Sequence, residues 1–221
     1  GMVTKVDFSE RPFKVEIDGN KNILAKAVII ATGASAKWLG IPDEERLNGF
    51  GVSACAVCDG FFYKGQDVVV VGAGDTAAEE ATYLAKLCTK VTMLVRRNEM
   101  RASKAMQKRV FNTENITVLF NHETKSINGE KGVESVTAYN NQTKEEIVIP
   151  ATGFFVAIVH KPKTDLFKVQ LDMDDNGYLI VEAGTSKTKI DGVFAAGDVA
   201  DHVYRQAVTS CLLYTSPSPR D

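Results

Sequence analysis

Tryptophan and cysteine are scarce in this chain of 221 residues, which has one tryptophan and four cysteines. Cys55, Cys58, Cys88 and Cys211 are too few for a disulfide scaffold in a protein of this size. Their scarcity favours a reducing compartment, in which a close pair of cysteines is catalytic or binds a metal ion. We therefore expect a cytoplasmic protein.

Long apolar runs and an excess of one charge are also missing. No run approaches the roughly 18 apolar residues that a transmembrane helix needs, and the first residues lack the apolar stretch of a signal peptide. The 26 Lys and Arg residues nearly balance 28 Asp and Glu residues, for a net charge of -2. This balance gives no reason to expect a nucleic-acid or membrane partner.

The middle of the chain has the alternating pattern of an α/β fold. The expected elements are a strand at 67–71, a helix at 76–87, a strand at 91–95, a helix at 101–112 and a strand at 116–120. Short alternating segments broken by turn residues over 124–149 predict an antiparallel β-meander. We predict a Rossmann-like domain that combines a parallel sheet with this meander.

Shorter elements flank this pattern. Short strands are expected within residues 3–30, and the apolar run 27–31 suits a strand buried on both faces. The polar stretch that starts at Gly40 is interpreted as a linker. Two further buried strands are expected at 154–158 and 192–196.

A glycine-rich turn joins the strand at 67–71 to the helix after it. Gly72 permits the tight turn, Gly74 lets the backbone approach a pyrophosphate, and Ala77 allows the helix to pack closely on the strand. Asp75 and Thr76 begin a helix whose N-terminal N–H groups and positive dipole end suit phosphates. The surrounding strands and helix favour dinucleotide binding over a tight turn without a ligand.

The end of the next strand indicates which dinucleotide binds. NAD sites place an acidic residue about 20 residues beyond the glycines, where it accepts from the ribose 2′-OH. This chain instead has Arg96 and Arg97, followed by Arg101. Guanidinium groups suit a 2′-phosphate, so NADPH is preferred. The alternative is a solvated basic start of the next helix, since Lys104, Lys108 and Arg109 follow closely.

Cys55 and Cys58 form a Cys-Ala-Val-Cys motif shortly before the nucleotide turn. Zinc would need a second Cys or His pair at similar spacing, and a buried structural pair is rarer, so a redox pair is the leading interpretation and no metal is expected. Such spacing lowers the pKa of one thiol and allows it to attack a disulfide. Asp59 either exchanges a proton with the reacting sulfur or caps a helix. Cys88 is expected to be a packed core thiol.

A nicotinamide and a disulfide need an intermediary. Nicotinamide delivers a hydride, whereas a disulfide accepts electrons through thiolate chemistry, so a flavin normally lies between them. The chain is therefore expected to use FAD as well as NADPH.

These residues together resemble the bacterial-type, low-molecular-weight thioredoxin reductases. The segments that carry the resemblance are 31–33, 55–60, 72–80, Arg96 and Arg97 with Arg101, and 197–199. In that family an NADPH domain holding the redox pair is inserted into an FAD domain. The resemblance implies a partial FAD-binding domain at 1–47 and 154–210, an NADPH-binding domain at 48–153, and a tail outside the family pattern at 211–221.

The resemblance also implies the role of each site residue. Cys58 would lie next to the flavin, Cys55 would attack the disulfide of thioredoxin, and Asp59 would be the acid-base partner. The expected FAD contacts are Thr32, Gly33, Gly197, Asp198, Arg205, Gln206 and Ala207. The full-length protein would be a homodimer.

The family pattern begins with a glycine-rich βαβ unit and ends with a helix over the flavin, and neither is present here. We therefore expect a piece of such a reductase that binds NADPH but holds FAD weakly. Two other functions stay open: a flavoprotein reductase of a peroxiredoxin-type peroxidase, and a nucleotide-binding fragment without turnover.

Overall fold

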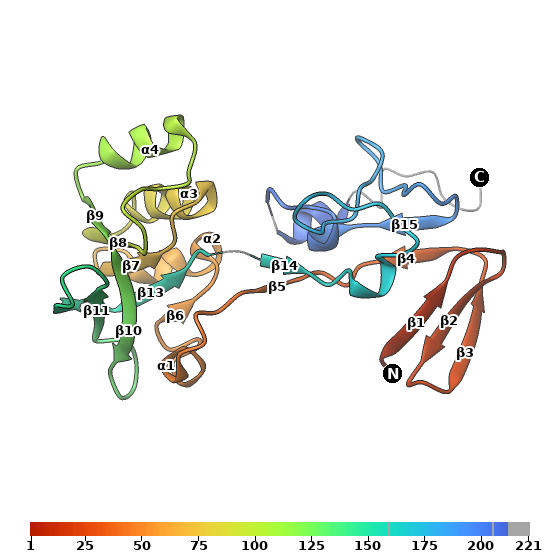
Figure 1. Cartoon of the computed structure of the whole chain (residues 1–221), viewed down its shortest axis with the longest axis horizontal. Helices are drawn as coiled ribbons and strands as arrows, with labels where there is room; N and C mark the ends of the chain where they lie inside the picture. Colours follow the sequence, from red (N-terminus) through yellow and green to blue (C-terminus); the bar gives the residue numbers. More distant parts are fainter. Residues whose placement is uncertain (159, 205, 212–221) are drawn as a thin grey trace. The chain divides into compact units, whose positions relative to one another are not determined.

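The computed structural model describes residues 1–158, 160–204 and 206–211 (Figure 1). The chain packs as two compact units, which we call the inserted unit, Ala36–Val159, and the outer unit, Gly1–Ser35 with His160–Asp221. No helix in the described ranges combines the length and the hydrophobicity that crossing a bilayer requires.

The inserted unit is built on a five-stranded parallel sheet in the order β6-β13-β7-β8-β9. The strands are β6 Val52–Ser53, β7 Asp67–Val71, β8 Lys90–Val95, β9 Ile116–Phe120 and β13 Gly153–Val156. The strands β7, β8 and β13 are almost fully buried, as their run of apolar residues predicts for a parallel sheet covered on both faces.

Alternate residues of β7 face two different layers. Val68 and Val70 pack with α3 Asp75–Leu84, whereas Val69 and Val71 pack against the meander. The meander consists of β10 His122–Asn128, β11 Ser135–Asn140 and β12 Glu146–Pro150. A second helix, α4 Lys104–Phe111, lies beside α3 (Figure 1). The predicted α/β fold, with a parallel sheet and a meander, is confirmed.

The segment that was expected to be a linker is instead anchored. It forms the short helix α1 Pro42–Arg46, and Glu44 is only 4% exposed. The Glu44 carboxylate accepts hydrogen bonds from the backbone N–H groups of Leu39 (2.9 Å), Gly40 (2.8 Å) and Ile41 (3.3 Å). The linker interpretation is wrong because a charged side chain in a polar stretch here satisfies the backbone that precedes it.

The outer unit has an antiparallel sheet of β1 Val3–Asp7, β2 Phe13–Ile17 and β3 Lys21–Ala25. A parallel pair follows, β4 Val28–Ile30 with β15 Val193–Ala195. The core contains Phe8, Phe13 and Phe167, with Phe8 edge-on to Phe13 and stacked with Phe167. The remaining elements are β5 Ala34–Ala36, β14 His160–Pro162 and the 3-10 helices η2 Asp165–Phe167, η3 Gly197–Val199 and η4 Ala207–Cys211.

The packing units do not coincide with the expected domain limits at 47/48 and 153/154. β13 lies between β6 and β7, so residues 154–156 pack in the inserted unit. Leu47 is buried in the same core, and the Arg46 guanidinium donates to the carbonyl of Gly129. The expected limits stay a prediction about function, whereas in packing the inserted unit is longer at both ends.

Candidate functional site

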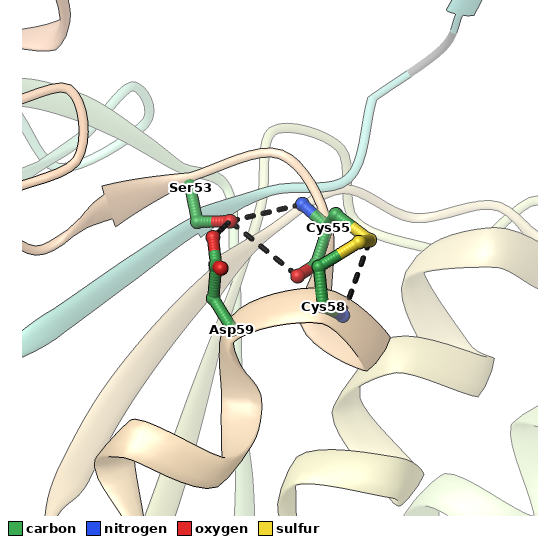
Figure 2. The surroundings of a disulfide bond; sticks show 4 residues. All are labelled: Ser53, Cys55, Cys58 and Asp59. Carbon is green, nitrogen blue, oxygen red and sulfur yellow. Dashed lines mark hydrogen bonds between the residues drawn. A yellow bond between two sulfur atoms is a disulfide. The ribbon is translucent and has the colours of Figure 1, made fainter. Parts of the chain in front are cut away.

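The two cysteines of the motif are joined in a disulfide at the end of β6 (Figure 2). Their sulfur atoms are 2.04 Å apart and their Cα atoms 5.3 Å apart. Cys55 is the N-cap residue of the short helix α2 Ala56–Asp59, and its Sγ accepts a hydrogen bond from the backbone N–H of Cys58 at 3.2 Å. Cys58 is exposed and Cys55 is partly buried. The N–H donor and the helix start favour negative charge on the Cys55 sulfur once the pair is reduced.

Asp59 ends α2 and lies close to the pair. Its side chain makes no capping hydrogen bond to the 3-10 helix η1 Gly60–Tyr63 that follows, so the helix-cap interpretation of Asp59 is wrong. Instead, Oδ2 of Asp59 accepts a hydrogen bond from Oγ of Ser53 at 2.6 Å (Figure 2). Burial raises the pKa of the neighbouring Tyr63, and the negative charge of Asp59 adds to that effect. The Asp59 carboxylate is thus held by a hydroxyl that also accepts a hydrogen bond from the Cys55 backbone N–H.

Sequence reasoning missed the apolar surface beside the pair. Phe61 is 67% exposed and Phe62 is 74% exposed, although both follow the motif directly. Val57, inside the motif, is exposed as well. Nothing in two adjacent phenylalanines distinguishes exposed from buried rings, because only the packing of η1 decides which way they face. Exposed aromatic rings next to a disulfide suit contact with another protein.

Cys88 lies apart from the pair and is a buried free thiol, as predicted for a core cysteine. It follows α3, which ends at Leu84, earlier than the expected helix end at 87. In the described ranges, no three His, Cys, Asp or Glu side chains gather in a way that could hold a metal ion.

We expect the Cys88 thiol to resist alkylation. Burial raises its pKa from 9.0 to about 11, and the charge of Asp67 adds to the shift. Because the thiolate is the reactive species, iodoacetamide at neutral pH should label Cys88 on the order of a hundredfold more slowly than an exposed thiol. Peptide mass spectrometry after brief alkylation measures this rate. Labelling at the rate of a free thiol would contradict the burial seen here.

The raised pKa of Cys88 also makes the stability of the folded chain depend on pH. The pKa in the folded state lies above the reference value, so the neutral thiol favours folding at neutral pH. That contribution should be lost as the pH rises from 9.0 to about 11. A Cys88→Ser variant should therefore show a shallower loss of stability over that pH range.

The nucleotide turn has two glycines with different surroundings. Gly72 has φ +150°, and a Cβ there would come within 2.3 Å of the Ala157 carbonyl oxygen and 2.7 Å of Ala77 Cβ. Gly72 and the fully buried Ala77 are therefore required by the fold itself. At Gly74 a Cβ would meet nothing within 4 Å. The space beside the start of α3, next to Asp75 and Thr76, is thus open and fits a pyrophosphate.

The three arginines come together in a groove of about 460 Å³ within the inserted unit. Arg96 and Arg97 follow β8, and Arg101 precedes α4 because its backbone N–H donates to the Ala73 carbonyl at 2.8 Å, outside the helix. The groove is completed by Lys37, Leu39, Ile41, Val71, Gly72, Ala73, Leu94, His122, Glu123, Thr124 and Ile158. Lys37 and His122 were missed, because each comes from a segment far from the glycine turn in the sequence.

The alternative of a plain basic helix start does not describe this groove. Lys104, Lys108 and Arg109 lie on α4, and Arg109 lines a separate hollow with Thr82 and Thr113. In the described part of the chain, the three groove arginines make no ion pair with an acidic side chain. Their charges are thus available to an anionic ligand.

The backbone that carries the arginines is held by the meander. The Asn141 side-chain amide donates to the Arg96 carbonyl and to the Glu123 carboxylate, each at 2.9 Å. The Asn121 N–H donates to the Arg97 carbonyl at 3.1 Å. The position of Arg96 therefore depends on a side chain 45 residues away, and that of Arg97 on the turn that precedes β10.

Four of the expected FAD contacts lie at one edge of the outer unit. β4 and β15 are parallel, so Thr32 and Gly33 after one strand lie beside Gly197 and Asp198 after the other. The Ala196 N–H donates to the Ile30 carbonyl at 3.0 Å across this edge. The carboxyl ends of parallel strands are where such sheets bind ligands.

The conformations of these residues fit a close approach to a ligand. Gly33 has φ +69° and a Cβ there would meet nothing within 4 Å, so the residues present leave room for a bound group. Thr32 is tied down, since its hydroxyl donates to the Lys163 carbonyl at 2.7 Å. Ala207 begins η4, which packs on η3, and Gln206 directly precedes it; Arg205 lies outside the described residues.

The glycine turn, the arginine groove and the disulfide lie in one compact unit, and the sequence pattern of the pyridine nucleotide-disulphide oxidoreductases matches residues 1–211. Similar proteins include the thioredoxin reductases of Rickettsia conorii, 50% identical over 94% of this chain and 68% of that protein, and of Dictyostelium discoideum, 51% identical over 94% and 66%. The structure of thioredoxin reductase from Giardia duodenalis matches with a TM-score of 0.89 at 45% identity, covering 94% of this chain and 69% of that one.

The chain belongs to the pyridine nucleotide-disulphide oxidoreductase family and, within it, to the thioredoxin reductases. It spans about two thirds of the length of these relatives, 68% in the case of the Rickettsia conorii protein. The predicted resemblance is confirmed.

Proposed function

We propose that this chain reduces the disulfide of thioredoxin with electrons from NADPH, through FAD and the pair Cys55 and Cys58. The observation that carries the proposal is the Cys55–Cys58 disulfide in the same compact unit as the nucleotide turn and the arginine groove. FAD, when bound, supplies the step that turns a hydride into the two electrons a disulfide accepts.

The exchange itself is carried by the two sulfur atoms. After the pair is reduced, the Cys55 thiolate attacks the partner's disulfide, forms a mixed disulfide and displaces one partner thiol. Cys58 then attacks the Cys55 sulfur, restores the internal disulfide and releases the second partner thiol. The Cys58 N–H bond to Cys55 Sγ supports Cys55 as the attacking thiolate. In this proposal Asp59 exchanges protons with these sulfurs, and the exposed rings of Phe61 and Phe62 offer contact area to the partner.

The nucleotide is assigned by charge and shape. Gly72, Gly74, Asp75, Thr76 and Ala77 would receive the pyrophosphate at the start of α3, and Arg96, Arg97 and Arg101 would bind the 2′-phosphate of NADPH. Thr32, Gly33, Gly197, Asp198, Arg205, Gln206 and Ala207 would hold FAD. A homodimer and a cytoplasmic location are further parts of the proposal.

The test mixes the purified chain with FAD, NADPH and oxidised thioredoxin. With FAD in excess, we expect one NADPH to be oxidised for each thioredoxin disulfide reduced, and we expect weakly held FAD to separate from the protein on gel filtration. An oxidised peroxiredoxin-type peroxidase is offered in parallel. Faster turnover with the peroxidase would mean that the peroxidase, and not thioredoxin, is the substrate. NADPH binding without reduction of either partner would contradict the enzymatic proposal.

A further inference from the structure

Ser53 lies where three groups of the redox site meet. It is the last residue of β6, pairs in register with Phe155 of β13 and is only 5% exposed. Its Oγ donates to Asp59 Oδ2 at 2.6 Å and accepts from the Cys55 backbone N–H at 3.0 Å (Figure 2). The Cys55 carbonyl oxygen lies 3.4 Å from the same Oγ. One hydroxyl therefore contacts both the carboxylate and the backbone of the attacking cysteine.

A hydroxyl can keep these contacts in both protonation states of the carboxyl group. It has one proton to donate and two lone pairs that accept. When Asp59 is ionised, the Ser53 proton points to Oδ2. When Asp59 has taken up a proton, the carboxyl O–H donates to Oγ, and the Ser53 proton turns to the Cys55 carbonyl at 3.4 Å. The Asp59 side chain need not move as the proton comes and goes.

We propose that Ser53 is a positioning residue for thiol-disulfide exchange, holding the Asp59 carboxylate in a fixed position next to the Cys55 backbone while Asp59 gains and loses a proton. This inference rests on the proposed function of Cys55, Cys58 and Asp59. Because Ser53 is buried and does not react, its effect on the exchange rate passes through Asp59. A substitution that removes its hydroxyl should therefore cost nothing once Asp59 can no longer exchange a proton.

The experiment follows the exchange directly, without any bound cofactor. All variants carry Cys211→Ser, so that the pair and the buried Cys88 are the cysteines present. The reduced protein is mixed with 5,5′-dithiobis(2-nitrobenzoate), which contains a disulfide. One protein thiolate forms a mixed disulfide and releases one thionitrobenzoate, and the second thiol closes the Cys55–Cys58 disulfide and releases another. Both releases are followed by absorbance in stopped flow.

Two substitutions of equal size isolate the hydroxyl. Ser53→Thr keeps it and Ser53→Val replaces it with a methyl group in the same strand position. We expect exchange in Ser53→Val to slow by about tenfold, the order expected when a hydrogen bond to a charged group is lost, while Ser53→Thr stays within about twofold of the parent protein. Ser53→Ala should behave like Ser53→Val. Ser126→Ala is the matched control, because it removes a hydroxyl bonded to Asn128 elsewhere in the inserted unit.

A double-mutant cycle with Asp59→Asn decides the outcome. If Ser53 acts through Asp59, Ser53→Val will slow the Asp59→Asn protein less than about twofold. Equal slowing with and without Asp59 would overturn the inference, and so would equal rates for the Thr and Val variants. If Asp59→Asn alone leaves the rate unchanged, the acid-base role in the proposed function fails instead.

Discussion

Replacing Cys58 with serine will abolish NADPH-dependent reduction of thioredoxin and leave Cys55 able to form a stable mixed disulfide with it. The reason is that the second step needs a thiol to attack the Cys55 sulfur, and Cys58 is the residue bonded to it here. Turnover should fall to background. Non-reducing electrophoresis and mass spectrometry should show one thioredoxin bound to each chain through Cys55.

The controls separate the two cysteines. Cys55→Ser should also stop turnover, but without accumulating the mixed disulfide at the same rate, because the remaining sulfur lacks the N–H donor that Cys55 receives from Cys58. Cys88→Ser, which alters a buried thiol away from the pair, should leave exchange unchanged. Equal trapping by both remaining sulfurs would contradict the assignment of Cys55 as the attacking residue.

Replacing Arg96 and Arg97 with alanine will weaken NADPH binding by about a hundredfold or more. Each guanidinium that binds a phosphate through charge-assisted hydrogen bonds contributes roughly 1.5–3 kcal/mol. NADH, which lacks the 2′-phosphate, should lose less than about threefold. Calorimetric titration with both nucleotides gives the two dissociation constants.

The matched control is Arg109→Ala, since Arg109 lies on α4 and lines a different hollow. Its NADPH affinity should change little, and its dependence on salt should match that of the unaltered protein. If the double variant lost affinity for NADH and NADPH equally, the arginines would act on the pyrophosphate or on the fold, and the choice of NADPH would need another explanation.

Two glycine substitutions separate the structural role of the nucleotide turn from its role in binding NADPH. Gly72→Ala should lower the free energy of unfolding by about 3 kcal/mol, because its Cβ would overlap the Ala157 carbonyl. Gly74→Ala should change the free energy of unfolding by less than about 1 kcal/mol while weakening NADPH binding about tenfold or more, because its Cβ would enter the open space beside α3. Denaturant unfolding and nucleotide titration measure the two effects. Weak binding together with lost stability at Gly74 would point to a structural role instead.

Local patterns were sufficient for much of the fold. The β-branched run 67–71, the glycine turn and the helix after it predict a strand-turn-helix unit, and β7, Gly72 and α3 confirm it. Helix limits were less accurate. The helix expected from residue 101 begins at Lys104, because Ser103 caps it and the N–H groups of Arg101 and Ala102 bond to Ala73.

Only the tertiary structure shows how the site is held. The cysteine motif and its spacing mark the redox chemistry, because two thiols three positions apart can bond wherever the chain turns. That Ser53 reaches Asp59, that Glu44 anchors its own segment, and that the Asn141 side chain supports Arg96 depend on where distant strands and turns meet. A reactive group formed by residues that are close in the sequence, such as Cys55 and Cys58, can be predicted from the sequence. The side chains that orient such a group cannot be predicted in this way, because packing of the core alone brings them close to the residues that they contact.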